Sequence, residues 1–102
     1  MDILARIKRL ILSGRIRFTS KAETEVAADH LTEELICEAI INAPTIFKKL
    51  RSKNPQTGQH ETLYVIIGLT FDGLAIYTKG KIATIDQQEY FYVLISSKRS
   101  KD

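Results

Sequence analysis

The chain has 102 residues, of which 44% are hydrophobic and 26% charged, and its formal net charge is +3. This length predicts one domain, residues 1–102, with a single hydrophobic core. The chain has a single cysteine, Cys37, so it can form neither an intramolecular disulfide nor a metal site built from several thiols. Proteins of reducing compartments typically lack disulfides, and this chain fits such a compartment. Arg6, Lys8 and Arg9 interrupt the first apolar residues, which excludes a signal-peptide core or a membrane span there. We therefore expect a cytoplasmic protein with no membrane partner.

Charge is distributed unevenly along the chain. Residues 1–21 sum to +5, residues 22–46 to −6 and residues 47–60 to +4. The last of these blocks, from Lys48 to Lys53, contains no acid. Such a block is typical of an edge that contacts phosphate, although basic runs also form plain solvated surfaces.

Three amphipathic helices are predicted in the first half of the chain. The first spans about residues 2–13, and Gly14, directly after it, is the expected stop signal. The second runs from about 20 to 28 and begins with the capping-box pattern of Ser20 and Glu23. Thr32 caps the third, which ends at residues 42–44, and residues 15–18 are expected to form a short extended connection.

Strands are predicted in the second half, where the hydrophobic period changes to two. The first begins at Thr45 and has a cationic exposed side that carries Lys49 and Arg51. Asp72-Gly73 lies between two apolar runs and predicts a hairpin with a two-residue loop. Residues 82–88 are expected to be a polar return before a final strand over residues 90–98. The fold class is therefore α+β, with three N-terminal helices packed on a four-stranded, mostly antiparallel sheet.

Strand alternation then assigns the side chains to two faces. The predicted core face of the hairpin carries Val65, Ile67, Leu69, Phe71, Leu74 and Ile76. The predicted opposite face carries Tyr64, Ile66, Gly68, Thr70, Ala75, Tyr77 and Lys79. In the final strand, Phe91, Val93 and Ile95 suit the core, and Tyr90, Tyr92, Leu94, Ser96 and Lys98 lie opposite.

These faces bring lysines, an arginine and tyrosines together outside the core, namely Lys49, Arg51, Tyr64, Tyr77 and Lys98. Metal-free RNA cleavage needs a base for the 2′-hydroxyl, cations for the charge that grows on the phosphate, and a donor for the leaving oxygen. Lysines and a tyrosine can supply these groups, and tyrosines can also stack unpaired bases. Tyrosines and lysines on an exposed strand are also common as ordinary amphipathic surface.

Other candidate sites are weaker. The sequence has no signature of a metal site, a nucleotide-phosphate loop or a Ser-His-Asp triad. His30, at a helix end, is expected to be structural. Cys37 is expected to behave as a small buried hydrophobe in the third helix.

Five stretches, in this order, carry a resemblance to a known family. They are I-K-R-L-I-L-S-G-R-I-R-F-T-S-K-A, I-F-K-K-L, L-Y-V, A-I-Y-T-K and V-L-I-S-S-K. Together they resemble the MqsR-type mRNA interferases of the RelE-like toxin group. The resemblance implies a RelE-like fold and a metal-independent endoribonuclease toxin of a type II toxin–antitoxin pair, with no cofactor. Its implied partners are mRNA, ribosome-associated in some members, and an antitoxin that often has a zinc-binding domain.

The resemblance also implies site residues. Lys49, Tyr77 and Lys98 match the family's lysine after the third helix, its sheet tyrosine and its terminal-strand lysine. Glu61 stands where the family has a glutamine, and a carboxylate there would repel phosphate. By alternation His60 shares the face of Tyr64, and its ordinary pKa of about 6.5 suits a general acid or base.

We therefore take Lys49, Tyr77, Lys98, His60 and Glu61 as candidate catalytic residues. The candidate RNA-binding residues are Lys48, Arg51, Lys53, Tyr64, Lys79 and Arg99. The alternative, which Glu61 favours, is a catalytically silent module on the same fold that binds RNA or a partner protein. An enzyme acting on small molecules has no pocket motif in its favour.

Overall fold

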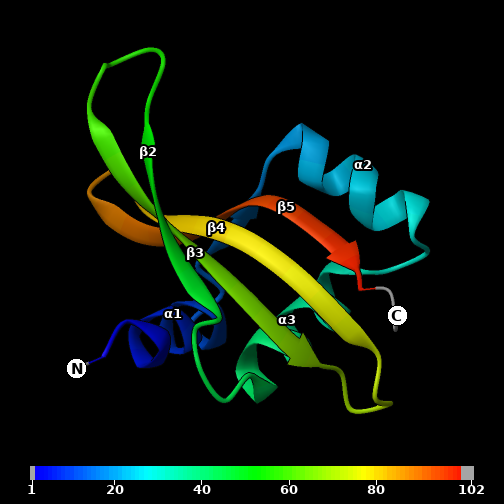
Figure 1. Ribbon diagram of the computed structural model, residues 1–102. Coiled ribbons are helices and arrows are strands. Elements are labelled where there is room, and N and C mark those ends of the chain that lie inside the picture. Colours follow the sequence, from blue (N-terminus) through cyan, green and yellow to red (C-terminus); the bar gives the residue numbers. More distant parts are fainter. Residues whose placement is uncertain (1, 100–102) are drawn as a thin grey trace.

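The computed structural model describes residues 2–99, in which three helices cover one face of a five-stranded sheet (Figure 1). The helices are α1 (Ile3–Leu12), α2 (Ser20–Ala28) and α3 (Glu33–Asn42). The strands are β1 (Ile16–Phe18), β2 (Lys48–Lys53), β3 (His60–Leu69), β4 (Ala75–Ile85) and β5 (Gln88–Lys98). The predicted α+β class and the three helices are confirmed, whereas the prediction of four strands is wrong. No helix among the described residues is long and apolar enough to cross a bilayer.

Each helix begins at a side-chain cap. Asp2, Thr19 and Thr32 each accept a hydrogen bond from the backbone N–H three residues further on, at 2.8 to 3.2 Å. The cap of α2 is thus Thr19 and not the predicted Ser20. A cap of this kind stabilises a helix by about 1 kcal/mol, so the three polar residues fix where the helices start.

The strand order is β1-β5-β4-β3-β2. The strand that was not predicted, β1, pairs parallel with β5 at one edge of the sheet. All other neighbouring strands pair antiparallel. This strand lies in the segment that was predicted as an extended connection. Three residues are too few for alternation alone to identify a strand. The predicted polar return is wrong as well: β4 and β5 continue through it to a tight turn at Asp86 and Gln87, whose φ values are 50° and 69°. Two successive positive φ values are typical of a type I′ hairpin turn.

The β3–β4 hairpin has a three-residue loop, Phe71–Gly73, where two residues were predicted. The Thr70 N–H donates to the Leu74 carbonyl at 2.9 Å, and Gly73 has a φ of +82°. Consequently Gly68 pairs with Ile76, one residue away from the predicted register. A one-residue shift moves every side chain of a strand to the other face.

The predicted faces of β3 are therefore reversed. Ile66 and Gly68 face the helices, whereas Val65, Ile67 and Leu69 lie on the opposite side. Leu69 and Phe71, predicted in the core, are 53% and 78% exposed. A Cβ on Gly68 would lie 1.8 Å from the Ala39 carbonyl oxygen of α3. Only glycine lets the helix lie this close to the strand.

A bulge changes the faces of β5 at Leu94. Gly80 pairs with Val93 and Lys79 with Ile95, which leaves Leu94 as an extra residue. Beyond the bulge, Ser96 and Lys98 lie on the helix side, paired with Thr78 and Ile76. The predictions that these two residues lie opposite the core, and that Ile95 lies in it, are therefore wrong.

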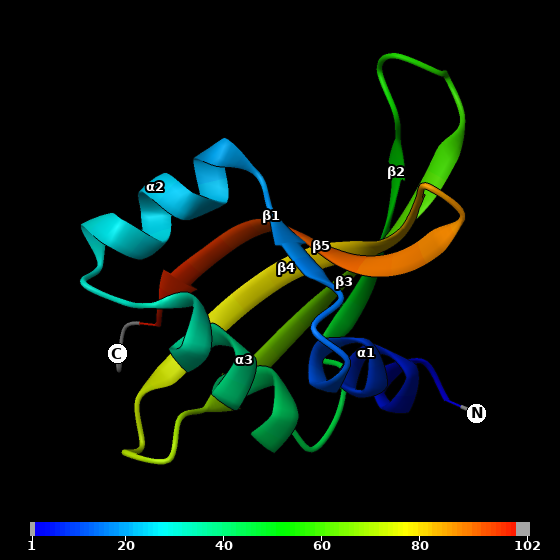
Figure 2. The same ribbon diagram turned by 180° about the vertical axis from the view of Figure 1, so that it is seen from behind.

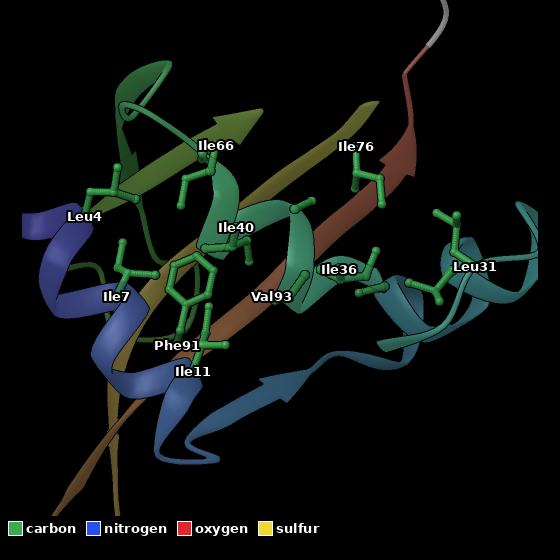
Figure 3. Packing of buried hydrophobic residues seen from close by; sticks show 14 residues of the cluster. Leu4, Ile7, Ile11, Leu31, Ile36, Ile40, Ile66, Ile76, Phe91 and Val93 are labelled. Carbon is green, nitrogen blue, oxygen red and sulfur yellow. The ribbon is translucent and has the colours of Figure 1, made fainter. Parts of the chain in front are cut away.

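The core fills the space between the helices and the sheet (Figure 3). It combines one apolar side of α1, one of α3 and the helix-facing side chains of β3, β4 and β5. Its labelled members are Leu4, Ile7, Ile11, Leu31, Ile36, Ile40, Ile66, Ile76, Phe91 and Val93. With this side of the sheet covered, the opposite side remains for a site.

Candidate nucleic-acid interface

We call the side of the sheet away from the helices the open face, since none of the described helices covers it (Figure 1). The pairing registers determine which side chains belong to it. Its cations are Arg17, Lys48, Lys79, Lys81 and Arg99, and its tyrosines are Tyr77, Tyr90 and Tyr92. Among the described strand residues on this face, Glu61 is the one carboxylate. The open face is therefore basic and aromatic.

Tyr77 lies within a group of these polar residues. It pairs with Ser97 of β5, and Lys79 stands two residues further along the same strand, about 7 Å away at the Cα atoms. The Arg99 N–H donates to the Ala75 carbonyl at 2.9 Å, which places Arg99 diagonally opposite Tyr77. A tyrosine hydroxyl, a lysine and an arginine thus share one part of the open face.

Lys48 extends this group across the sheet. It pairs with Val65 of β3, which in turn pairs with Lys79 of β4, so the two lysines flank one apolar residue. Val65 and Leu63 are only 0% and 8% exposed although no described helix covers them. Neighbouring side chains of the open face must shield them, and they provide an apolar floor beneath the cations.

Two cation–aromatic contacts order the rim of the open face. The Arg17 guanidinium lies 4.4 Å from the centroid of the Tyr90 ring. The Arg99 guanidinium lies 6.0 Å from the centroid of the Phe47 ring. The sequence analysis did not identify Arg17 as a candidate binding residue, because it did not predict β1. The alternation of apolar Ile16, charged Arg17 and apolar Phe18 is the one signal for this strand in the sequence. The predicted placement of Tyr90 and Tyr92 away from the core is confirmed.

The remaining predicted cations and rings lie on the helix side of the sheet. These are Lys49, Arg51, Lys53, His60, Tyr64 and Lys98. Tyr64 packs against the hydrophobic core. Lys49 pairs with Tyr64 and lines a hollow of about 350 Å³ beside the start of α1. The Lys98 N–H donates to the Asp29 carboxylate at the end of α2, at 2.8 Å.

The predicted common site is consequently not formed. Tyr77 and Lys98 lie on opposite faces of the sheet, and Lys49 is also on the side away from Tyr77. The predicted sharing of a face by His60 and Tyr64 is confirmed, but that face is the helix side. Of the five candidate catalytic residues, Tyr77 and Glu61 lie on the open face.

Glu61 is engaged by its neighbours. Lys81 Nζ lies 2.7 Å from one carboxylate oxygen, and the Asn54 side-chain amide donates to the other. The hydrogen bonds from Lys81 and Asn54 hold the pKa of Glu61 below its ordinary value. The carboxylate is therefore ionised at neutral pH, and the ammonium group of Lys81 compensates its charge. Because it is paired with Glu61, this ammonium group is less available to a phosphate.

A structural role also explains part of the basic pattern. β2 is an edge strand, and its sequence Lys48–Lys53 alternates cations between both faces. Lysines on an edge strand discourage pairing with the edge of another molecule. This role accounts for the block as a whole, but it does not account for the cations and tyrosines on the inner strands β4 and β5.

No metal site stands out among residues 2–99, because no group of three or more His, Cys, Asp or Glu side chains there is placed to hold a metal ion. Cys37, predicted to be a small buried hydrophobe in the third helix, lies in α3 and is half-buried. Burial, followed by the charges of Glu33 and Glu34, raises the pKa of the Cys37 thiol. A raised pKa reduces the thiolate fraction, so this cysteine is a poor nucleophile at neutral pH.

The open face, with Tyr77, Lys79, Arg99 and Lys48 on it, is thus the candidate interface. Comparison of the chain with protein-family models, with curated proteins and with solved structures gives no match.

Proposed function

We propose that the protein binds single-stranded RNA on the open face of its sheet. The observation that carries this proposal is the grouping of Tyr77, Lys79, Tyr90 and Tyr92 on the inner strands β4 and β5, which the edge-strand role of β2 does not explain. Sheet surfaces of this composition bind single strands because cations contact phosphates while aromatic rings stack on unpaired bases. The resemblance of the sequence to the MqsR-type mRNA interferases supports RNA as the ligand.

The binding test uses pairs of neighbouring cations that lie on opposite faces. Lys48→Ala is compared with Lys49→Ala, and Arg99→Ala with Lys98→Ala, by fluorescence anisotropy of a labelled 20-nucleotide RNA at several salt concentrations. The open-face variants should bind several-fold more weakly. They should also flatten the dependence of log K on log salt by about 0.7 for each lost phosphate contact.

The helix-side variants serve as the matched controls and should bind almost as the wild type does. Equal losses in both members of each pair would show that net charge alone attracts RNA, and would overturn the open-face proposal. Failure of the wild type to bind RNA would overturn it as well.

The second candidate function is metal-independent cleavage of the bound RNA. The position of Tyr77 favours it, since a hydroxyl flanked by Lys79 and Arg99 offers proton transfer and stabilisation of phosphate charge in one place. In this proposal the 2′-hydroxyl attacks the adjacent phosphorus, the bond to the 5′-oxygen breaks, and a 2′,3′-cyclic phosphate forms. The toxin–antitoxin role and the RelE-like fold implied by the resemblance belong to this candidate.

Cleavage is tested on labelled RNA with the protein alone in EDTA, and separately with ribosomes in a buffer that contains Mg²⁺. Tyr77→Phe should lower the rate by about 10²-fold, the scale of losing one group that acts in the transition state, while its affinity for RNA changes less. Lys98→Ala should cleave at the wild-type rate, because Lys98 lies on the other face. RNA that stays intact under all conditions would eliminate cleavage and leave binding as the function.

A further inference from the structure

Residues of α1 and α3 line a groove on the helix side of the molecule. Figure 2 shows these two helices on that side of the sheet. The groove's volume of about 560 Å³ falls within the range of roughly 300–1,000 Å³ that ligand-binding clefts occupy. Ile11, Ile16, Cys37 and Ile41 contribute apolar lining. This groove is separate from the open face and plays no part in the proposed RNA site.

Exposed hydrophobic side chains flank the groove. Leu12, at the end of α1, is 77% exposed, and Phe71, in the β3–β4 loop, is 78% exposed. Both line the same hollow although they come from distant parts of the chain. The Phe71 N–H donates to the Glu38 carboxylate at 3.1 Å, which holds the loop against α3. The groove is therefore pre-formed, and an occupant would bury both side chains.

The groove is also acidic. Glu33, Glu34 and Glu38 of α3 line it, and none of the lysines or arginines among residues 2–99 does. Glu33 and Glu34 suit the first turn of a helix, where negative charge favours the dipole. That role does not explain why two exposed hydrophobic residues stand beside the same three carboxylates.

We propose that the groove binds a short amphipathic helix of a partner protein, with apolar anchors one turn apart and lysines or arginines beside them. Helices bind in grooves through anchors at positions i, i+3, i+4 and i+7. Opposite charge around such anchors favours the correct partner and orientation. RNA does not fit here, because the carboxylates repel phosphate.

A second copy of this chain does not fit the groove. Its most basic helix, α1, has the apolar side chains Leu4, Ile7 and Leu10 buried in its own core. An occupant has to bring an apolar face of its own. The occupant is therefore a different protein, or a segment of one, that presents a free basic amphipathic helix.

The test uses a synthetic, fluorescein-labelled helical peptide with leucines at positions 2, 5, 6 and 9 and lysines elsewhere. The control peptide has the same leucines and glutamates in place of the lysines. Anisotropy titration with the full chain should show binding of the lysine peptide at least tenfold tighter than that of the glutamate peptide. Equal binding of the two peptides would overturn the proposal.

Variants then locate the binding. Phe71→Ala and the double variant Glu33→Gln/Glu34→Gln should each weaken the lysine peptide at least fivefold. Their matched controls are Leu69→Ala, an exposed hydrophobic residue outside the groove, and Glu23→Gln, an exposed acid on α2. These controls should bind as the wild type does. Losses in the controls equal to those in the groove variants would contradict the assignment.

A readout on the unaltered protein makes the test independent of any folding defect. Cys37 lines the groove, so bound lysine peptide should slow its reaction with a thiol reagent, whereas the glutamate peptide should not. An unchanged rate with saturating lysine peptide would overturn the proposal. Self-association that Phe71→Ala abolishes would also overturn it, by assigning the groove to a second copy.

Discussion

Gly68 shows how one residue sets the arrangement of a strand and a helix. Its hydrophobic neighbours Ile66 and Ile67 do not reveal which face of β3 is buried, because both suit a core. The glycine does reveal it, since it marks the place where the α3 backbone touches the strand. The sequence contains this signal, but strand alternation with a two-residue loop places Gly68 on the face away from the core, and in the structure Gly68 faces α3.

Replacing Gly68 by alanine should destabilise the protein strongly, because the new methyl group would meet the Ala39 carbonyl. We expect a loss of about 3 kcal/mol or more in the free energy of unfolding, at the upper end of overpacking effects. Gly14→Ala is the control: it has open space and a φ of +75°, so it should cost about 1 kcal/mol. Urea denaturation measures both, and similar losses would contradict the close contact.

Glu61 shows how neighbours can alter a residue that was assigned from a motif. Its carboxylate was expected to repel phosphate, but Lys81 and Asn54 compensate its charge. Neither partner could be identified from the sequence, because their approach depends on the register of β3 with β4 and on the conformation of the β2–β3 loop.

Because the folded pKa of Glu61 is lowered, its stabilising effect is present above the unfolded pKa of about 4.3 and is lost as the pH falls through the folded value. Glu61→Gln should therefore lower the free energy of unfolding at pH 7, measured by urea denaturation, by about 1 kcal/mol or less, as for a partly exposed ion pair. The difference in free energy of unfolding between the variant and the wild type should shrink as the pH falls below about 4. A gap that is constant between pH 7 and pH 3 would contradict this account.

At the scale of elements, periodicity was sufficient for the helices but not for the strands' faces. The three helices and their approximate ends followed from apolar spacing and caps. The faces of β3 and β5 were misassigned because of one extra loop residue at Phe71–Gly73 and one bulge residue at Leu94. Val93, Leu94 and Ile95 are all apolar, so alternation offers no contrast by which to locate a bulge.

The bulge can be tested with engineered disulfides in a Cys37→Ser background. The Thr78 and Ser96 hydroxyl oxygens lie 3.4 Å apart, so Thr78→Cys/Ser96→Cys should oxidise readily. Thr78→Cys/Ile95→Cys would be the facing pair if β5 had no bulge, and it should stay reduced because its side chains point to opposite faces. Mass spectrometry after mild oxidation distinguishes the two, and preferential oxidation of the second pair would show that the strand is continuous.

At the scale of the molecule, opposite charges lie on different surfaces. The open face combines cations and tyrosines from β1, β2, β4 and β5, whereas the acidic side chains of α3 line a groove on the helix side. The basic and acidic blocks were visible in the sequence. Their placement on two sides was not, because it depends on strand order and on the two register changes.

The same dependence explains the fate of the predicted site. Lys49, Tyr77 and Lys98 all lie on strands, as predicted, but the sheet separates Tyr77 from the two lysines. Their sequence neighbours Lys48 and Arg99 join Tyr77 instead. The sequence was sufficient to predict that the interface contains lysines, arginines and tyrosines. Which of two neighbouring cations lies on the open face, Lys48 or Lys49 and Lys98 or Arg99, depends on the pairing register of the strands.

The central claim, that RNA lies on the open face, is tested most directly by NMR of the protein's tyrosine rings. The chain has four tyrosines: Tyr77, Tyr90 and Tyr92 are on the open face, and Tyr64 packs against the core on the helix side. With ring-labelled tyrosine, addition of a single-stranded oligonucleotide should shift the three open-face signals, since stacked bases alter ring shieldings, and leave the Tyr64 signal in place. A shift of Tyr64 with the other three unchanged would contradict the account.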